Sequence, residues 1–254
     1  MRVVHVEART LPEAWERSLV ELARAGERVP TEYGDWSIDA PAVIVVEEPF
    51  AEPRVHLKGI VASSLRGLEE YAREVVAGIH DDRAGEYGYT YHERLRRYPT
   101  PSFSPLTGRV VGLDELDQVG AMVEKLLSAP CTRRAQAITW VPWKDLKSEH
   151  PPCLQRVWAR VVDGRLRLHV HMRSNDALKA AFMNMYAFTE LQRALAEAVW
   201  VEPGPYVHFA DSYHVYGRDI KWFRKFVEQI ESGESRKYWR TTGEYRRMAG
   251  LGDR

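Results

Sequence analysis

Hydrophobic positions recur at steps of three and four residues in several parts of the chain, and elsewhere they form short β-branched runs. The first pattern is typical of amphipathic helices and the second of buried strands. A helix is predicted at residues 11–25, where Thr10 and Glu13 fit a capping box, Pro12 lies near the start and Gly26 follows the end. Further helices are predicted at 65–79, 113–128, 177–200 and 219–233, and strands at 42–46, 136–141 and 206–216. Residues 82–109, rich in aromatic residues, Pro and Gly, are expected to form a long ordered loop.

The sharpest local signal is Asp163-Gly164 between two β-rich runs, which predicts a two-residue hairpin turn. In that hairpin Val162 faces Arg165, and each step back along the first strand matches one step forward along the second. An unbroken ladder sets Cys153 opposite Ser174, and a bulge shifts this pairing by one residue. Either register brings the thiol beside the guanidinium of Arg173 and the hydroxyl of Ser174.

The helix predicted at 177–200 carries a polar residue on its apolar face. Asn184 falls on the stripe formed by Ala177, Ala181, Phe188, Leu191, Leu195 and Val199. A buried carboxamide without partners costs about 1–3 kcal/mol. The amide is therefore either satisfied by neighbouring backbone or faces a ligand with a mixed donor–acceptor edge, such as a pyrimidine. Ser174, Asn175 or Asp176 is the expected N-cap of this helix.

Composition narrows the class of protein. The chain has 254 residues, 44% hydrophobic and 28% charged, with a formal net charge of zero, so no bulk charge favours nucleic acid or membrane. We find no apolar signal core and no membrane-spanning apolar run, and two cysteines fit a reducing compartment, so we expect a cytoplasmic protein. Residues 236–254 are basic and are expected to form a solvated, mobile tail rather than a binding arm.

Cys153 has two interpretations at this level: a small buried residue at the start of a strand, or a nucleophile. A reactive thiolate needs nearby positive charge. Arg173 would supply it, and a helix starting near Asp176 would add a favourable dipole. Arg173, Ser174 and the pair Arg133-Arg134 are candidates for binding a phosphate. The residues themselves thus indicate a nucleophilic cysteine, an anion pocket and a buried amide.

These residues also carry a specific resemblance. The run PPCLQ…VVDGRLRLHVHMRSNDALKAAFMNM resembles the thymidylate synthase family, especially its shorter archaeal-type members. GEYGYTYHERLRRY (85–98), CTRRAQAITW (131–140) and EPGPYVHFADSYHVY (202–216) resemble further family segments in the family's order. The resemblance is strongest over roughly residues 85–220. It implies one α+β domain over 1–254, in three layers, with a large mixed, mostly antiparallel twisted sheet flanked by helices. Two such sheets would pack back to back in an obligate homodimer.

The resemblance also implies residue roles. Cys153 matches the nucleophile that adds to C6 of the uracil ring, and Tyr91 matches a tyrosine in the water network that helps remove the C5 proton. Arg173 and Ser174 match the phosphate and thiol neighbours, while Arg133 and Arg134 match arginines that reach the partner subunit's substrate. Asn184 matches the amide that hydrogen-bonds the O4 and N3 edge of the pyrimidine. His214 and Tyr216 match the pair that bonds the deoxyribose hydroxyl. Asp176 matches the carboxylate that faces the pterin.

Two family features are not evident in the sequence. For the catalytic glutamate on an early helix the candidate is Glu70, with Glu74 as a competitor. The amino-terminal phosphate arginine has only Arg54 as a weak candidate.

The implied activity is thymidylate synthase: reductive methylation of dUMP to dTMP with methylene-tetrahydrofolate or methylene-tetrahydromethanopterin, without a metal. A pyrimidine nucleotide 5-hydroxymethylase acting on dUMP, dCMP or CMP is the alternative, because MAGLGDR lacks the apolar tail that closes over the cofactor in many members. Hydroxymethylases that act on deoxycytidylate tend to carry Asp at the position of Asn184, so the amide favours uracil. A non-catalytic nucleotide- or RNA-binding protein is a third class. Cys153 argues against it, because binding alone needs no thiol.

Overall fold

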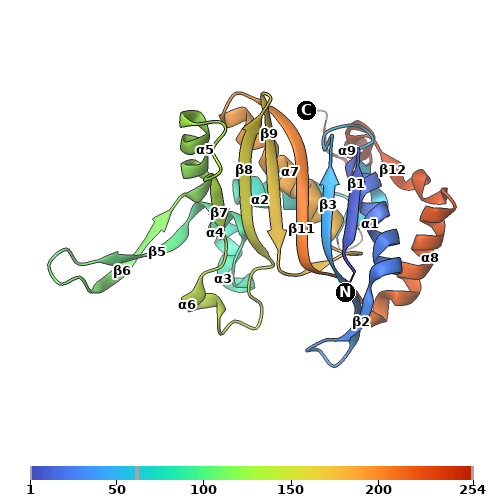
Figure 1. Ribbon diagram of the computed structural model, residues 1–254, viewed down its shortest axis with the longest axis horizontal. Coiled ribbons are helices and arrows are strands. Elements are labelled where there is room, and N and C mark those ends of the chain that lie inside the picture. The colour runs from blue at the N-terminus through green and yellow to red at the C-terminus, as the bar shows by residue number, and fades with distance from the viewer. Residues whose placement is uncertain (1, 61–62, 253–254) are drawn as a thin grey trace.

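The computed structural model describes residues 2–60 and 63–252. Its centre is a mixed eight-stranded sheet (Figure 1). The strand order is β1 (Val4–Ala8), β3 (Trp36–Val46), β11 (Glu202–Tyr216), β9 (Arg165–Met172), β8 (Leu154–Val162) and β7 (Gln136–Ile138). β2 (Glu27–Pro30) pairs with β3, and β10 (Asn175–Asp176) pairs with β11. Four of these seven pairings are antiparallel, so the α+β class and the mixed sheet are confirmed.

Helices cover one face of this sheet. In Figure 1, α2 (Gly67–Ala77) and α7 (Ala181–Ala198) pass behind the strands, and no helix of the described residues crosses the near side of β8, β9 and β11. α1 (Leu11–Ala25) and α8 (Ile220–Glu231) pack together beside β1 and β3. The remaining helices are α3 (Ala84–Tyr87), α4 (Tyr91–Arg96), α5 (Gln118–Ser128), α6 (Pro142–Asp145) and α9 (Thr242–Met248), with 3-10 turns at Leu57–Ile60, Asp81–Arg83, Gly217–Asp219 and Glu234–Tyr238.

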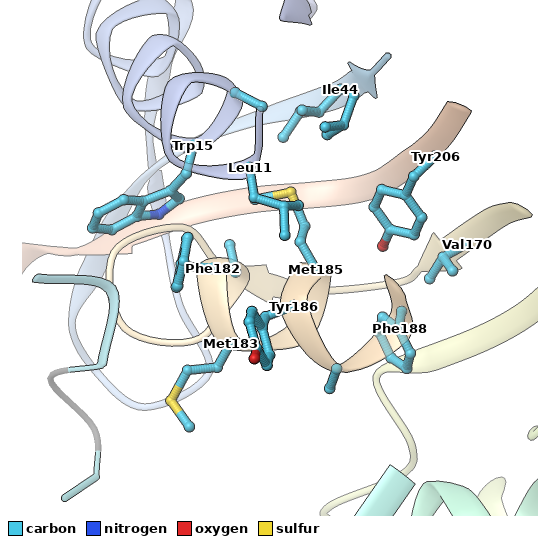
Figure 2. Packing of buried hydrophobic residues seen from close by; sticks show 14 of the residues in the cluster. Leu11, Trp15, Ile44, Val170, Phe182, Met183, Met185, Tyr186, Phe188 and Tyr206 are labelled. Atoms are coloured by element: carbon cyan, nitrogen blue, oxygen red, sulfur yellow. The ribbon is translucent and has the colours of Figure 1, made fainter. Parts of the chain in front are cut away.

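The core lies between α7 and the covered face of the sheet. Alternate residues of β9 point inward, which buries Leu166, Leu168, Val170 and Met172 against α7. Figure 2 shows Trp15 and Leu11 of α1 meeting Phe182 and Met185 of α7, with Tyr206 of β11 beside them. Each fully buried side chain of this size contributes about 1.5–3 kcal/mol. Among the described residues, no helix is long and apolar enough to cross a membrane.

The hairpin prediction is confirmed, and the ladder is broken by a bulge that shifts the pairing by one residue. Asp163 and Gly164 both have positive φ, 52° and 71°, as a two-residue turn of this kind requires. Val162 pairs with Arg165 and the ladder continues to Arg156 opposite His171, after which it shifts by one residue. The backbone N–H of Arg173 therefore donates to the carbonyl of Cys153 at 2.8 Å, and Ser174 lies one residue further on.

Several predicted boundaries are wrong. The segment 113–128 is not all helix, because residues up to Leu116 form β6 (Val110–Leu116) opposite β5 (Tyr98–Phe103), and α5 begins only after the Asp117 cap. The expected loop at 82–109 holds α3, α4 and β5. The helix predicted at 177–200 begins at Ala181, because residues 175–176 join the sheet as β10. The Thr10 side chain makes no capping hydrogen bond.

The basic carboxyl-terminal segment is folded rather than solvated up to residue 252. β12 (Trp239–Arg240) pairs with β4 (Val55–His56), and the indole N–H of Trp239 donates to Glu16 Oε1 at 2.9 Å. Tyr245 of α9 is fully buried, and Arg246 pairs with Glu69 at 2.7 Å. Residues 236–252 are therefore packed on the body rather than fully solvated, because Tyr245 is buried and Tyr238 and Trp239 are partly buried.

Candidate functional site

A cavity of about 690 Å³ opens where β8 begins and β9 and β11 end, and its lining comes from segments that are far apart in the sequence. Its walls come from the β2–β3 hairpin, α2, the turn before α4, the segment 148–153 and β11. Six of the sequence-predicted site residues line it: Tyr91, Cys153, Arg173, Ser174, His214 and Tyr216. Five predicted residues are not in its lining: Glu70, Arg133, Arg134, Asp176 and Asn184.

Arg173 holds the backbone that precedes Cys153. Its Nε donates to the Pro152 carbonyl at 3.0 Å and its Nη2 to the Pro151 carbonyl at 2.7 Å. The next backbone N–H, of Leu154, donates to the Tyr91 hydroxyl at 3.3 Å. Two prolines before the cysteine thus present carbonyls to a guanidinium, and the half-buried thiol is fixed at the cavity wall.

The electrostatics of Cys153 differ from the sequence-based expectation. Burial raises the pKa of this thiol, and the nearby Arg173 charge lowers it by less. The expected help from a helix dipole is missing, because α7 begins at Ala181 rather than near Asp176. Without a ligand the thiol is therefore protonated at neutral pH, and a further favourable interaction is needed to form the thiolate.

Three tyrosines surround the thiol. Burial raises the pKa of Tyr71, Tyr89 and Tyr91, so all three are neutral phenols in the physiological range. The rings of Tyr89 and Tyr91 lie 5.7 Å apart, and Tyr91 packs on Phe188 of α7 at 5.8 Å. The Tyr91 hydroxyl accepts the Leu154 N–H and is also hydrogen-bonded to the Tyr89 side chain. Sequence reasoning missed Tyr71 and Tyr89, which no motif distinguishes from ordinary aromatic residues.

Asn184 is joined to the cavity wall through Tyr71. The amide is 7% exposed, and its Oδ1 accepts a hydrogen bond from the Tyr71 hydroxyl at 2.8 Å. Tyr71 itself lines the cavity. The partner of the buried amide is thus a side chain of α2, and not the neighbouring backbone.

Of the two candidate glutamates, Glu74 lines the cavity and Glu70 is exposed on α2 outside the cavity lining. Glu74 Oε2 lies 2.8 Å from His80 Nδ1, which holds the carboxylate in place. Sequence spacing could not separate the two, because they are one helical turn apart.

His214 and Tyr216 reach the cavity from β11, with their rings 4.9 Å apart. Ser212 lies on the same strand, donates to Asp39 of β3 and lies 3.1 Å from His214 Nδ1. Ser212 and Asp39 also line the cavity and were missed in the sequence, because a bulge between Ala210 and Tyr213 alters the register of this strand.

The cavity has little positive charge of its own. Arg173 is the single Lys or Arg among the described residues of its lining, which include the carboxylates of Glu32, Asp39, Glu74 and Glu149. A phosphate would need more cations than this wall supplies.

Arg133 and Arg134 are exposed and lie elsewhere. The Arg133 carbonyl accepts from the indole of Trp158, five residues along β8 from Cys153. At about 3.3 Å per residue Trp158 lies roughly 17 Å along the strand from Cys153, and neither arginine lines the cavity of its own chain.

Arg54 and Asp176 are engaged in other contacts. Arg54 is buried, pairs with Glu190, donates to Thr189 at 2.7 Å and is stacked between Phe50 and Tyr186. These partners occupy its guanidinium, and Arg54 is outside the cavity lining, so the structure gives no support to its suggested role in phosphate binding. Asp176 Oδ1 accepts the backbone N–H groups of Leu178 and Lys179.

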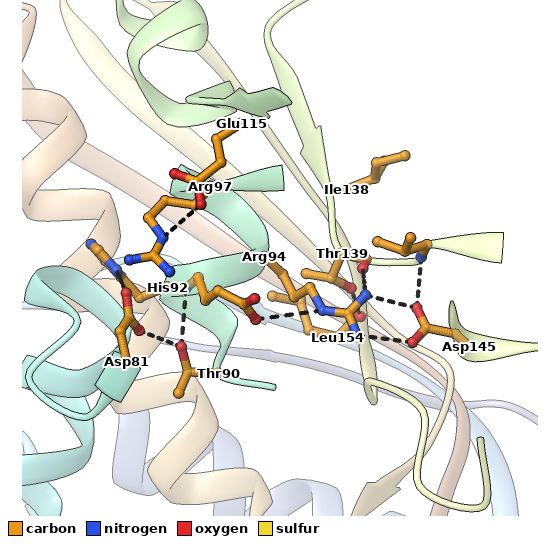
Figure 3. A network of polar contacts seen from close by, with 12 residues as sticks. Asp81, Thr90, His92, Arg94, Arg97, Glu115, Ile138, Thr139, Asp145 and Leu154 are labelled. Carbon is orange, nitrogen blue, oxygen red and sulfur yellow. Dashed lines mark hydrogen bonds and ion pairs between the residues drawn. The ribbon is translucent and has the colours of Figure 1, made fainter. Parts of the chain in front are cut away.

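A buried ion pair supports the segment that leads to the cysteine (Figure 3). Arg94 of α4 donates to both carboxylate oxygens of Asp145 at 2.9 Å, and both side chains are 3% exposed. Arg94 also donates to the Thr139 carbonyl, and the Thr139 hydroxyl donates to the carbonyl of Leu154. This network joins α4 to the residue that follows Cys153. Among the described residues, no cluster of three or more His, Cys, Asp or Glu is arranged to hold a metal ion.

Comparison with known proteins adds an independent observation. A family model described as "Thymidylate synthase" matches residues 43–240. A protein of Methanosarcina acetivorans named "Putative thymidylate synthase" is 30% identical over 226 residues, which cover 89% of this chain and 95% of that protein. Proteins of the same name from Methanopyrus kandleri and Methanothermobacter thermautotrophicus are 31% identical over 220 residues and 25% identical over 229 residues. These matches cover 86% and 85% of this chain, and 96% and 95% of the two proteins.

Proposed function

We propose that this chain, which belongs to the thymidylate synthase family of methyltransferases, converts dUMP to dTMP by reductive methylation. The observation that carries this proposal is the half-buried Cys153 thiol at the wall of a cavity, between Arg173 and three neutral phenols. A site that only bound a nucleotide would have no use for a thiol in this position.

The reaction begins at Cys153. Addition of Sγ to C6 of the uracil ring makes C5 a carbon nucleophile, which then bonds to the transferred one-carbon group. A methylene-tetrahydropterin, either tetrahydrofolate or tetrahydromethanopterin, supplies the methylene and the hydride when bound. The proton on C5 must leave before the thiol is released. Tyr91 supports this step, because its phenol keeps a proton and can order a water beside the ring.

The wall residues then have separate tasks. Arg173 and Ser174 meet the phosphate, and His214 and Tyr216 meet the sugar hydroxyl. Glu74 takes the glutamate role in polarising the ring through water, because its carboxylate lines the cavity and Glu70 is exposed. Asp176 is assigned to the pterin, since its Oδ2 has no hydrogen bond among the described residues.

We assign Arg133 and Arg134 to the substrate of a second subunit. Two observations support this: Arg173 is the single Lys or Arg among the described residues of the cavity lining, and the helix-free side of the sheet exposes an aromatic row. Trp158, His169 and Phe209 stand side by side there, with ring distances of 4.7 and 6.1 Å, and are only partly buried in one chain. A second copy packed sheet against sheet would cover this row and bring the partner's arginines toward the phosphate.

Mixed dimers test this assignment. Cys153→Ser removes the nucleophile, while Arg133→Ala with Arg134→Ala removes only the residues donated to the partner. Each variant alone is expected to be inactive. In a mixed dimer one site combines an intact Cys153 with intact arginines from the other chain. Recovered activity supports donation between subunits, and no recovery in a mixture shown to exchange subunits contradicts it.

The proposed reaction is tested by mass spectrometry of the product from dUMP and a methylene-tetrahydropterin. A methyl product is expected. A hydroxymethyl product, heavier by one oxygen, would mean that water and not hydride quenches the intermediate. Failure to modify dUMP with either pterin would contradict the proposal.

A further inference from the structure

We propose that Tyr71 is a specificity-determining residue that fixes the orientation of the Asn184 amide, so that its NH2 group, and not its oxygen, faces position 4 of the pyrimidine. This inference rests on the proposed function, because it concerns the ring that the cavity takes. Tyr71 of α2, which no sequence motif identified, then determines the preference between uracil and cytosine.

Three observations carry the inference. The Tyr71 hydroxyl donates to Asn184 Oδ1 at 2.8 Å. Asn184 is 7% exposed, and no hydrogen bond to its Nδ2 is found within residues 2–60 and 63–252. Tyr71 lines the cavity that holds Cys153. The amide is therefore more than nine-tenths buried, its acceptor is engaged, and its donor group has no partner.

A carboxamide can turn by half a rotation and exchange its oxygen for its NH2 group. Free to turn, the amide could accept from the amino group of cytosine or donate to O4 of uracil. The contact with Tyr71 selects one orientation, because a neutral phenol is a good donor and its oxygen, conjugated to the ring, is a poor acceptor. Oδ1 is thereby held on the Tyr71 side.

The NH2 group of Asn184 determines whether uracil or cytosine is preferred. Nδ2 offers hydrogens, which match the carbonyl at position 4 of uracil and oppose the amino group at position 4 of cytosine. Burial sharpens the choice, because an unmatched polar group away from water is costly. Removing the Tyr71 hydroxyl should release the amide, and dCMP should gain affinity relative to dUMP.

The test measures binding and needs no turnover. Dissociation constants for dUMP and dCMP are determined by calorimetry on the full-length Cys153→Ser protein, with and without Tyr71→Phe. The parent is expected to prefer dUMP. Tyr71→Phe should reduce the ratio of the two affinities about tenfold, corresponding to about 1.4 kcal/mol. Tyr245→Phe is the matched control, since its buried hydroxyl donates to the Leu65 carbonyl outside the cavity lining, and it should leave the ratio unchanged.

A second comparison distinguishes an effect of Tyr71 on the Asn184 amide from a general loosening of the site. In an Asn184→Ala background, Tyr71→Phe should no longer change the ratio, because the tyrosine acts through the amide. An unchanged ratio with Tyr71→Phe in the parent would overturn the inference while leaving the proposed function intact. If the parent binds neither nucleotide, the proposed function itself fails. Tyr71→Leu, which also lacks the hydroxyl, repeats the test should the Phe variant fail to fold.

Discussion

Asp145→Asn is the perturbation that tests most sharply how the chain holds its cysteine. The carboxylate accepts both Nη groups of Arg94 at 2.9 Å and the Val141 N–H at 2.6 Å, and both members of the ion pair are 3% exposed. The Asn variant keeps the shape but removes the buried counter-ion of the guanidinium, which then has only the more distant Glu93, 3.7 Å from Nε. Breaking a buried pair from one side costs about 3–5 kcal/mol of unfolding free energy.

The control is an exposed ion pair. Glu234 and Lys237 lie 3.6 Å apart with side chains 60% and 56% exposed, so Glu234→Gln should cost about 0–1 kcal/mol. Both variants are compared with the parent by urea unfolding at pH 7. The double variant Arg94→Met with Asp145→Leu should recover part of the loss, because neither charge then remains unpaired.

Loss of the ion pair should also change the reactivity of Cys153 toward alkylation. Thr139 accepts from Arg94 and donates to the carbonyl of Leu154, the residue after Cys153. Alkylation of Cys153, followed by peptide mapping, should therefore be faster in Asp145→Asn than in the parent. A loss of stability no larger than that of Glu234→Gln, with unchanged alkylation, would refute the role given to this network.

Two further predictions concern ionisable groups. Glu74→Gln should lower kcat for dTMP formation at least tenfold, whereas Glu70→Gln should stay within twofold of the parent; equal losses in steady-state assays would contradict the assignment of Glu74. Burial lowers the pKa of His208 to about 3, so the folded state keeps this imidazole neutral while the unfolded chain takes up a proton below about pH 6.5. The stability from this group is therefore complete above pH 6.5 and is lost as pH falls toward 3, at about 1.4 kcal/mol per pH unit. His208→Gln should remove about 2 kcal/mol of the loss measured by urea unfolding between pH 7 and pH 5, and an identical loss in the variant would rule this out.

The parts of the fold that could be predicted are those set by local chemistry. Asp163-Gly164 specifies a turn by its positive φ values, and the register of β8 and β9 follows from it, including the possible shift by one residue. Cys153, Arg173 and Ser174 could therefore be brought together from the sequence. The helix α1 was equally accessible, because its apolar stripe and Gly26 are local signals.

The remaining features depend on distant partners. Residues 113–116 have a helical pattern but pair with β5, and residues 175–176 join β11 and delay the start of α7. The basic carboxyl-terminal segment is ordered by Glu16 and Glu69, which lie far away in the chain. Which of two glutamates faces the cavity depends on how α2 packs on α7, and that packing is tertiary.

The central claim is that Cys153 adds to the pyrimidine ring and thereby activates C5. Release of tritium from [5-³H]dUMP in the presence of a methylene-tetrahydropterin measures this directly. The parent chain is expected to release tritium in step with dTMP formation, and Cys153→Ser should release none while still binding dUMP in calorimetry. Tritium release by Cys153→Ser at the parent rate would contradict the account.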